Sequence, residues 1–465
     1  MSEVSVWAER LSLPREDDEL KKRLGVSALP VGLLDLNDLD ASAEILKAAL
    51  ERIHVATAQE LATLRRVFAV GRAHALKHHA DERTHIRSLY DLRASVEREP
   101  YTCMITSLGG IGKSALADAI KRLLGRPSSI EIAGHGTAPV AGGIVIEIGS
   151  GTRLVDVLNA VRSALDENCE GIFTNSNAES QKRARSLLVR AGCCFIIVDE
   201  FQFLTHSTEA SAQLAKTLAF LRGLGVPLFF IGNYSLGHRL LRRPQEERQR
   251  LLLSPIVLQP DLPTDPEYRQ LLGEYKVACA GMLNIDVDRD AEDIHWFTGG
   301  TKRLLRQLIV EAFRIAGERA RREKSPVSIS VRELRVAYKS QAFDVNRADL
   351  ERCRQVLIGG ISIRNRTKHL DLVCPFELEP QQQEVQEALV HCAMAATRAA
   401  ESIVDVMTSD EIAGAQRARD QFGMDTDLPL PRAKKTSTPR PKKTLESLRR
   451  AQATVAPPTG LLGHP

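Results

Sequence analysis

No apolar run in this chain of 465 residues is long enough to span a membrane, and its first residues lack the pattern of a secretory signal peptide. The 8 cysteines are scattered without C-x-x-C spacing, which argues against a zinc site or a disulfide framework. We therefore expect a cytoplasmic protein with reduced thiols and no membrane contact. Hydrophobic residues make up 43% and charged residues 26%, so the chain can build two or three ordinary globular domains.

The stretch from Ser107 to Ser114 predicts a phosphate-binding turn. It follows a strand-like apolar run over residues 101–106 and opens a helical pattern at Ala115. Glycines let successive backbone N–H groups surround phosphate oxygens, and the helix N-terminus adds positive potential. The residues expected to contact the nucleotide are Gly109, Gly110, Ile111, Gly112, Lys113, Ser114 and Ala115.

Lys113 and Ser114 carry the chemistry expected of this turn. In the pattern G-x-x-x-x-G-K-[ST] the lysine reaches the β- and γ-phosphates, and the hydroxyl binds Mg²⁺. Ser107 stands where the pattern has its first glycine. Since that position mainly eases the turn, we expect the serine to be tolerated. The alternative is a glycine-rich strand–helix turn with a chance lysine.

An acidic pair ends a second buried strand. Residues 193–198 form a short continuous apolar run, which Asp199 and Glu200 follow. Carboxylates at the end of a buried strand are costly unless they bind a cation or position water. Asp199 is therefore predicted to help hold Mg²⁺, and Glu200 to act as the base that orients the attacking water. An acidic cap on the next helix is the alternative.

The alternation of strands and helices predicts an α/β fold with a parallel sheet. Further strands are expected over residues 144–148 and 228–232, with a glycine-rich loop over 134–143. Asn233 follows the last of these strands directly. Because ligands bind at the carboxyl ends of parallel strands, Asn233 should lie near Lys113 and Asp199, where it would hold the lytic water or sense the γ-phosphate. Otherwise it simply starts a loop.

The N-terminal part is expected to be helical after a partly ordered segment over residues 1–38. Ser42 can cap a first helix, and Thr57 begins a capping box for a second. The basic residues of the second helix predict a solvated face that could touch DNA or a partner subunit. They are Arg65, Arg66, Arg72, His74, Lys77, His78 and His79.

A basic segment over residues 237–253 leads through a proline-marked linker, 255–263, into an all-helical region. Within this region Gly299 and Gly300 precede a helix that carries Lys302 and Arg303 in its first turn. This placement predicts a sensor of the γ-phosphate. A basic surface helix is the alternative.

The last residues differ in composition from the rest. Residues 431–465 contain six prolines and one acid, Glu446, so we expect a disordered tail that binds nucleic acid or an acidic partner, or only aids solubility. Its basic residues are Arg432, Lys434, Lys435, Arg440, Lys442, Lys443, Arg449 and Arg450. Residues 341–430 have a mixed pattern with a helix-like run over 381–408.

The order of these parts resembles the AAA+ ATPases, and more closely the TnsC/TniB-type regulators of bacterial DNA transposition. The phosphate turn and the acidic pair are common to many ATPases. The D-E-x-Q-x-L continuation and the later Gly-Gly helix are more telling. The similar stretches are Ser107–Ser114, FIIVDEFQFL at 195–204, FIGN at 230–233 and TGGTKRLL at 298–305.

The resemblance implies a role for each residue of the predicted site. The roles are ATP and Mg²⁺ binding by Lys113 and Ser114, the Walker B pair Asp199 and Glu200, sensor 1 at Asn233 and sensor 2 at Arg303. It also implies an arginine supplied to the ATP of a neighbouring subunit. Arg250 or Arg248 stands nearest the expected place, although the family's usual Arg-Phe pair is not visible there.

The resemblance further implies an AAA+ P-loop core over residues 96–260 and a helical lid over 261–340. A helical N-terminal extension, 1–95, and a C-terminal extension, 341–430 with its tail 431–465, would flank them. Members of this family assemble with ATP on double-stranded DNA as rings or helical filaments, in the bacterial cytoplasm at the nucleoid. The flanks would then dock the target-selector protein and the transposase subunits.

The leading hypothesis is thus a DNA-stimulated ATPase that acts as a transposition matchmaker. Another AAA+ or STAND-type ATPase, such as an origin-binding initiator or a signalling protein, is the first alternative. A protein that binds ATP without hydrolysing it is the second, and the intact Asp199–Glu200 pair argues against it.

Overall fold

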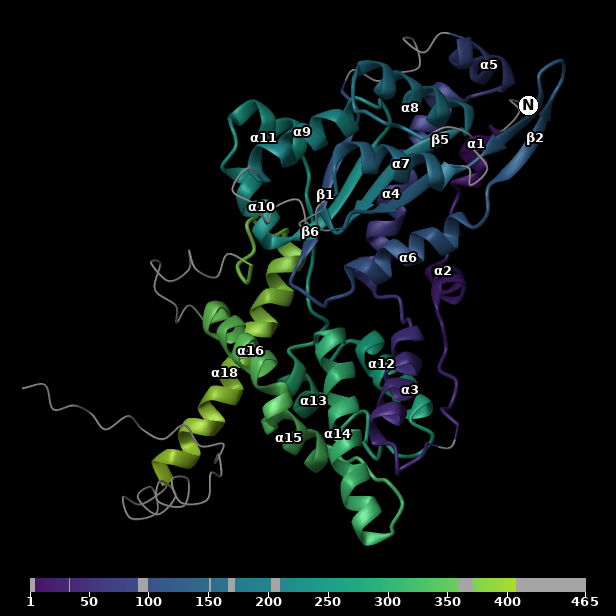
Figure 1. Cartoon of the computed structure of the whole chain (residues 1–465). Helices are drawn as coiled ribbons and strands as arrows, with labels where there is room; N and C mark the ends of the chain where they lie inside the picture. The colour runs from purple at the N-terminus through teal and green to yellow at the C-terminus, as the bar shows by residue number, and fades with distance from the viewer. Residues whose placement is uncertain are drawn as a thin grey trace, which may run out of the picture. The chain divides into compact units, whose positions relative to one another are not determined.

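The computed structural model describes residues 5–32, 34–90, 99–149, 152–165, 172–201, 210–358 and 371–406. Residues 1–394 form one compact unit (Figure 1). Residues 395–465 form a second unit, of which only the end of one helix lies in the described ranges. The predicted tail over 431–465 therefore lies outside the described residues.

A five-stranded parallel sheet is the centre of the first unit. Its strand order is β4-β5-β6-β1-β7. The strands are β1 (Thr102–Ser107), β4 (Gly142–Glu147), β5 (Cys193–Asp199), β6 (Leu228–Asn233) and β7 (Ile256–Leu258). Because all strands run the same way, their carboxyl ends meet at one edge of the sheet, where β1, β5 and β6 each end in a polar residue.

The two faces of the sheet are covered by different helices, as alternation along the strands requires. Cys103 and Ile105 of β1 face a cluster with α1 (Val6–Arg10), α2 (Asp17–Leu24), α4 (Ala58–His78) and α6 (Lys113–Leu124). Met104 faces the other cluster. The helices on that side are α7 (Leu154–Leu165), α8 (Ala178–Arg190), α9 (Ala210–Arg222), α10 (Tyr234–Leu241) and α11 (Gln245–Leu251).

A third apolar cluster forms the helical lid. It contains α12 (Pro266–Ala278), α13 (Ala291–Thr298), α14 (Lys302–Glu323) and α15 (Val331–Lys339). One helix from the N-terminal part, α3 (Leu39–Arg52), buries Leu46 and Leu50 in the same cluster. The N-terminal helices are thus divided between the lid and the sheet.

Several sequence expectations about the N-terminal part and the connections are wrong. Residues 5–24 are ordered around buried Trp7, because the amphipathic helices α1 and α2 pack on the sheet cluster. Asp38, not Ser42, caps α3, since Ser42 lies inside that helix and donates to the carbonyl of Asp35. The loop expected over 134–143 is mostly a hairpin, β2 (Ser128–Ile132) and β3 (Gly136–Val140).

The basic face predicted for α4 is also wrong in its histidines. Helix α4 begins as expected, with the Thr57 hydroxyl accepting from the N–H of Glu60. His74, His78 and His79, however, are buried beside α5 (Glu82–Tyr90) and α1. The ring of His85 stacks on Trp7 at 4.5 Å between centroids, so aromatic packing accounts for this cluster.

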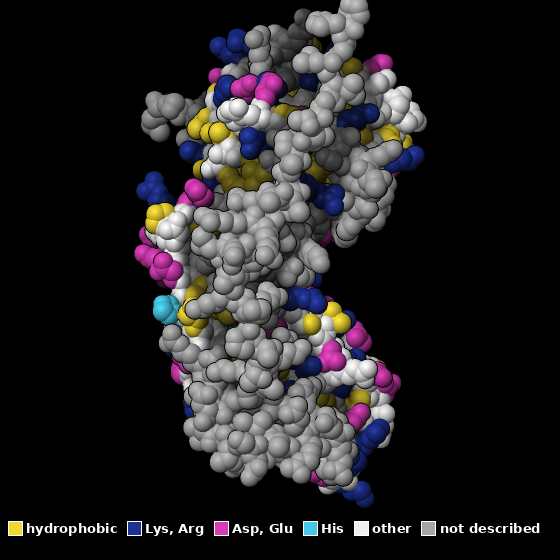
Figure 2. Space-filling view, turned by 90° about the vertical axis from the view of Figure 1, so that its left-hand side faces the viewer, with side chains coloured by type: hydrophobic (Ala, Val, Ile, Leu, Met, Phe, Trp, Pro, Cys, Tyr) yellow, Lys and Arg dark blue, Asp and Glu magenta, His cyan; other side chains and the backbone are white. Residues whose placement is uncertain are grey.

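The C-terminal part of the first unit returns to the sheet. Helix α16 (Asp344–Leu357) packs on the lid through Leu350, and α18 (Pro380–Val406) begins beside β7. Figure 2 shows the side of the molecule that carries these helices, and acidic and basic side chains are interspersed among those described there. No helix within the described ranges is both long and apolar enough to cross a membrane.

Candidate nucleotide-binding site

The phosphate turn holds the lysine in an enclosed position. Gly110 and Gly112 have φ values of 84° and 131°, which favour glycine, and Gly112 caps α6. Lys113 opens that helix and is buried. Its Nζ donates to Oγ of Ser107 at 3.0 Å and to the carbonyl of Leu108 at 2.9 Å. The serine that replaces the first glycine of the pattern thus supports the lysine.

Burial determines the electrostatics of this lysine. It lowers the pKa of Lys113 to about 8, with a further contribution from Arg303, while Glu200 and Asp199 oppose the shift. A buried ammonium lacks full hydration, so an anionic ligand gains more from it than from an exposed lysine. The turn is therefore suited to bind phosphate.

The acidic pair faces the start of α6. The Ser114 Oγ lies 3.5 Å from Oε1 of Glu200, and the N–H of Glu200 donates to Oδ1 of Asp199 at 2.7 Å. Burial raises the pKa of Asp199, although this last hydrogen bond opposes the shift. A carboxylate that is costly to ionise at this place gains stability from a cation.

Glu200 also has an unusual backbone. Its φ is 57°, in the left-handed region that non-glycine residues seldom adopt. Such strain, of order 1–3 kcal/mol, persists where surrounding structure imposes it and is found at functional sites. Here it follows the last residue of β5 and turns the carboxylate toward the phosphate turn.

Asn233 and Arg303 approach the turn from opposite directions. Asn233 ends β6 and is the register partner of Ser107 in β1. Arg303 comes from the first turn of α14 in the lid, and its N–H donates to the carbonyl of Gly110 at 3.2 Å. The lid therefore contacts the turn, and the neighbouring strand β6 ends beside it.

Arg250 and Arg248 are not brought to this group of residues. Both are exposed on α11, and Arg250 pairs with Glu246 on the same helix at 2.6 Å. An exposed ion pair of this kind contributes little to stability. Arg250 therefore remains able to meet another surface.

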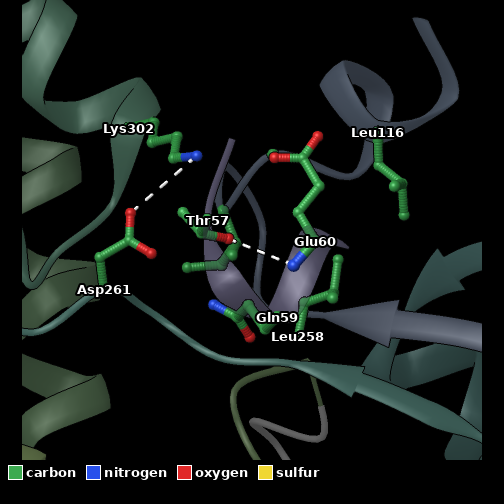
Figure 3. Close-up of a pocket in the computed structure, with 9 residues that line it drawn as sticks. Thr57, Gln59, Glu60, Leu116, Leu258, Asp261 and Lys302 are labelled. Carbon is green, nitrogen blue, oxygen red and sulfur yellow. Dashed lines mark hydrogen bonds and ion pairs between the residues drawn. The ribbon is translucent and has the colours of Figure 1, made fainter. Parts of the chain in front are cut away.

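A pocket adjoins the turn, and the sequence did not reveal it (Figure 3). The pocket is small and open to solvent, with a cavity volume of about 20 Å³. Its lining joins the start of α4, the phosphate turn with α6, the end of β7 and its linker, and the lid. The residues are Thr57, Gln59, Glu60, Ile111, Gly112, Leu116, Leu258, Asp261 and Lys302.

Two buried carboxylates give the pocket an acidic edge. Lys302 Nζ lies 4.0 Å from Oδ2 of Asp261, and His54 Nε2 lies 3.1 Å from Oε1 of Glu60. Burial raises the pKa of Asp261 to about 6, while Lys302 opposes the shift. For Glu60 burial is the largest single effect and acts in the same direction, but the hydrogen bond and charge of His54, the charge of Lys302 and the hydrogen bond with the Thr57 backbone together lower the pKa.

The sequence signals for this pocket were incomplete. The capping box at Thr57 and the basic pair at 302–303 were visible, but nothing in the pattern joined them. Asp261 lies in a segment taken for a proline-marked linker, in which the short strand β7 was also missed. Only the folded chain places residues about two hundred positions apart side by side.

A family model matches part of this chain. Residues 96–240 match the family model described as AAA domain. Similar solved structures include the Aeropyrum pernix ORC1 protein in complex with DNA, with 19% identity, TM-score 0.36, and coverage of 78% of this chain and 83% of that one. A comparison with curated proteins finds no match.

Two further solved structures are similar at comparable levels. The Aeropyrum pernix ORC2 protein, in ADPNP–ADP complexes, has 15% identity, TM-score 0.35, and coverage of 70% of this chain and 85% of that one. The Thermotoga maritima RuvB Holliday junction branch migration motor has 14% identity, TM-score 0.30, and coverage of 64% and 76%. The parallel sheet, its flanking helices and the family match together confirm the predicted fold: this chain contains an AAA+ P-loop domain.

Proposed function

We propose that this protein is an ATPase that uses nucleotide state as a switch. The observation that carries the proposal is the meeting of Lys113, Ser114, Asp199 and Glu200 at the carboxyl edge of the sheet. A buried lysine, a hydroxyl and two carboxylates are the groups that triphosphate hydrolysis requires. The products are ADP and phosphate, with water as the nucleophile.

Each residue has a distinct part in this proposal. Lys113 binds the β- and γ-phosphates, Glu200 and Asn233 orient the attacking water, and Arg303 brings the lid to the γ-phosphate. Ser114 and Asp199 fit Mg²⁺, because the Ser114 hydroxyl hydrogen-bonds the Asp199 carboxylate, whose ionisation is disfavoured by burial. The ion would neutralise charge on the phosphate oxygens.

The adjoining pocket lies where the nucleobase and ribose would extend from the turn, and it must widen to hold them. Ile111, Leu116 and Leu258 supply apolar surface for a planar ring. Glu60 and Asp261 supply acceptors for the N–H groups of an adenine or for ribose hydroxyls. A nucleotide that spans the pocket and the turn would contact the core and the lid at once.

For the wider role, we propose an ATP-dependent regulator of DNA transposition of the TnsC/TniB type, which assembles on double-stranded DNA and recruits the transposase. The sequence resemblance over residues 105–305 supports this proposal, and exposed Arg250 is available for the ATP of a neighbouring subunit. We assign phosphate contacts to the basic residues of the tail, 431–465.

Electron microscopy of the full chain with duplex DNA tests this role. Samples with a slowly hydrolysed ATP analogue and with ADP are compared. Rings or filaments on arbitrary duplex in the analogue sample alone would support the proposal. Binding to one defined DNA sequence would favour an origin-binding initiator. A protein that stays monomeric and does not bind DNA in either sample would contradict both.

A further inference from the structure

The linker after β7 has the pocket on one side and α18 on the other. Leu258 and Asp261 line the pocket. The carbonyl of Val257 and the side chain of Gln259, in the same segment, instead contact α18. A single extended segment therefore forms part of the pocket wall and part of the surface on which α18 packs. The contacting residue of α18 lies more than 120 positions later in the chain.

Three glutamines make these contacts. The Gln59 side chain accepts from the N–H of Gln259 at 2.9 Å and donates to its carbonyl at 2.7 Å. The Gln259 side chain donates to the carbonyl of Gln382 at 2.9 Å. The Gln382 side chain donates to the carbonyl of Val257 at 2.8 Å. Hydrogen bonds thus run from a residue of the pocket to the first turn of α18.

Loss of these glutamine hydrogen bonds would leave buried polar groups without partners. Gln259 is only 7% exposed, so its amide depends on protein partners. Among the described strands, β7 pairs with β1 and is the last in the order of the sheet. Gln382 therefore bonds a carbonyl on the open edge of that strand. Leaving such a buried group without its partner is unfavourable.

We infer that Gln259 and Gln382 are positioning residues of the nucleotide pocket, an inference that rests on the proposed nucleotide binding there. Neither side chain is part of the pocket lining. They hold the linker so that Leu258 and Asp261 face the ligand, and Asp261 in turn pairs with Lys302 of the lid. Because coupling is reciprocal, nucleotide that fixes the linker also stabilises the docking of α18.

The test compares two charge-matched variants of the full chain. Gln382→Glu can still accept from the N–H of Glu379, 3.2 Å away in this structure, but has no N–H for Val257. Gln383→Glu is the control, because Gln383 is exposed and its side chain bonds only Leu378, in its own segment. Gln259→Met removes the hydrogen bond from the Gln259 side chain to the carbonyl of Gln382 and keeps a side chain of similar length.

The readouts are KM and kcat for ATP, Kd for a slowly hydrolysed analogue, and amide exchange over residues 380–390. We expect Gln382→Glu and Gln259→Met to raise KM and Kd roughly fivefold with kcat within about twofold. Gln383→Glu should leave both unchanged. In the wild type the analogue should slow exchange at the start of α18, and in Gln382→Glu it should not.

Two outcomes would overturn the inference, and they differ from a failure of the proposed function. One is equal affinity in Gln382→Glu and Gln383→Glu. The other is exchange at the start of α18 that does not respond to the analogue in a wild type that binds it. A lower melting temperature in Gln382→Glu with unchanged Kd would show a structural role only. A wild type that binds no ATP would instead remove the proposed function itself.

Discussion

The backbone N–H of Arg303 donates to the carbonyl of Gly110 at 3.2 Å. This hydrogen bond joins the first turn of the lid helix α14 directly to the phosphate turn. The contact is close because Gly110 has no side chain. A Cβ built there would lie 2.8 Å from Cβ of Arg303 and 2.9 Å from Cγ2 of Thr301. A side chain at position 110 would therefore push the lid helix away from the turn.

Replacing Gly110 with alanine should separate the lid from the turn. The φ of 84° adds backbone strain of roughly 1–2 kcal/mol to the clash. We expect Gly110→Ala to unfold at lower denaturant concentration than the wild type, with faster amide exchange at the start of α14. Gly109→Ala is the matched control, since its Cβ would meet nothing within 4 Å. Equal midpoints for the two variants would contradict the packing described.

The affinity for ATP should depend on pH through Lys113. Burial lowers the pKa of Lys113 to about 8, and bound phosphate should raise it again. The complex then binds more protons than the free protein above pH 8, so affinity should be constant below about 8 and fall as pH rises. Titration calorimetry in buffers of different ionisation enthalpy measures the proton uptake. Lys113→Arg should abolish the pH dependence of ATP affinity. If the pH dependence persists in this variant, another group causes it.

Two substitutions of Glu200 separate the effect of its backbone strain on stability from the role of its carboxylate in hydrolysis. Its φ of 57° suits asparagine and is unfavourable for a β-branched residue. Both Glu200→Asn and Glu200→Val should lose hydrolysis, because neither has the carboxylate. Only Glu200→Val should lose stability, by roughly 1–2 kcal/mol, while Glu200→Asn should match or exceed the wild type. Denaturant unfolding measures the difference, and indistinguishable midpoints would show that no strain is stored there.

The buried histidines should make the fold sensitive to acid. Burial lowers the pKa of His85 to about 4, whereas in the unfolded chain it returns to the ordinary value of 6.5. The unfolded state thus binds more protons between these values, and the free energy of unfolding should fall as pH drops from about 6.5 toward 4. Urea unfolding across this range measures the slope. His85→Gln should reduce it, and replacement of exposed His135 should not.

The sequence predicted the parts of the site whose chemistry is local. Lys113 and Ser114 are defined by a contiguous pattern, and Asp199 by its place at the end of an apolar run, so the sheet and its polar edge followed. The fifth strand, Ile256–Leu258, was missed because three residues between prolines carry no periodic signal. The histidines of α4 were misread because periodicity identifies a face of a helix without showing what packs on it.

The pocket and the glutamine contacts could not be predicted in this way. Gln59, Gln259 and Gln382 come from three separate regions, and an isolated glutamine has no pattern that indicates a partner. Their meeting depends on where α4, β7 and α18 pack on one another. Tertiary packing, rather than local preference, determined this part of the site.

Phosphate release from ATP in the presence of Mg²⁺, by wild type and Glu200→Gln with nucleotide affinity measured in parallel, tests the central claim most directly. The account predicts that the wild type hydrolyses ATP. It predicts that Glu200→Gln binds ATP as the wild type does but turns it over at least about a hundredfold more slowly. Lys113→Ala should lose binding altogether. Equal turnover by Glu200→Gln and the wild type, or a wild type that binds ATP without hydrolysing it, would contradict the claim.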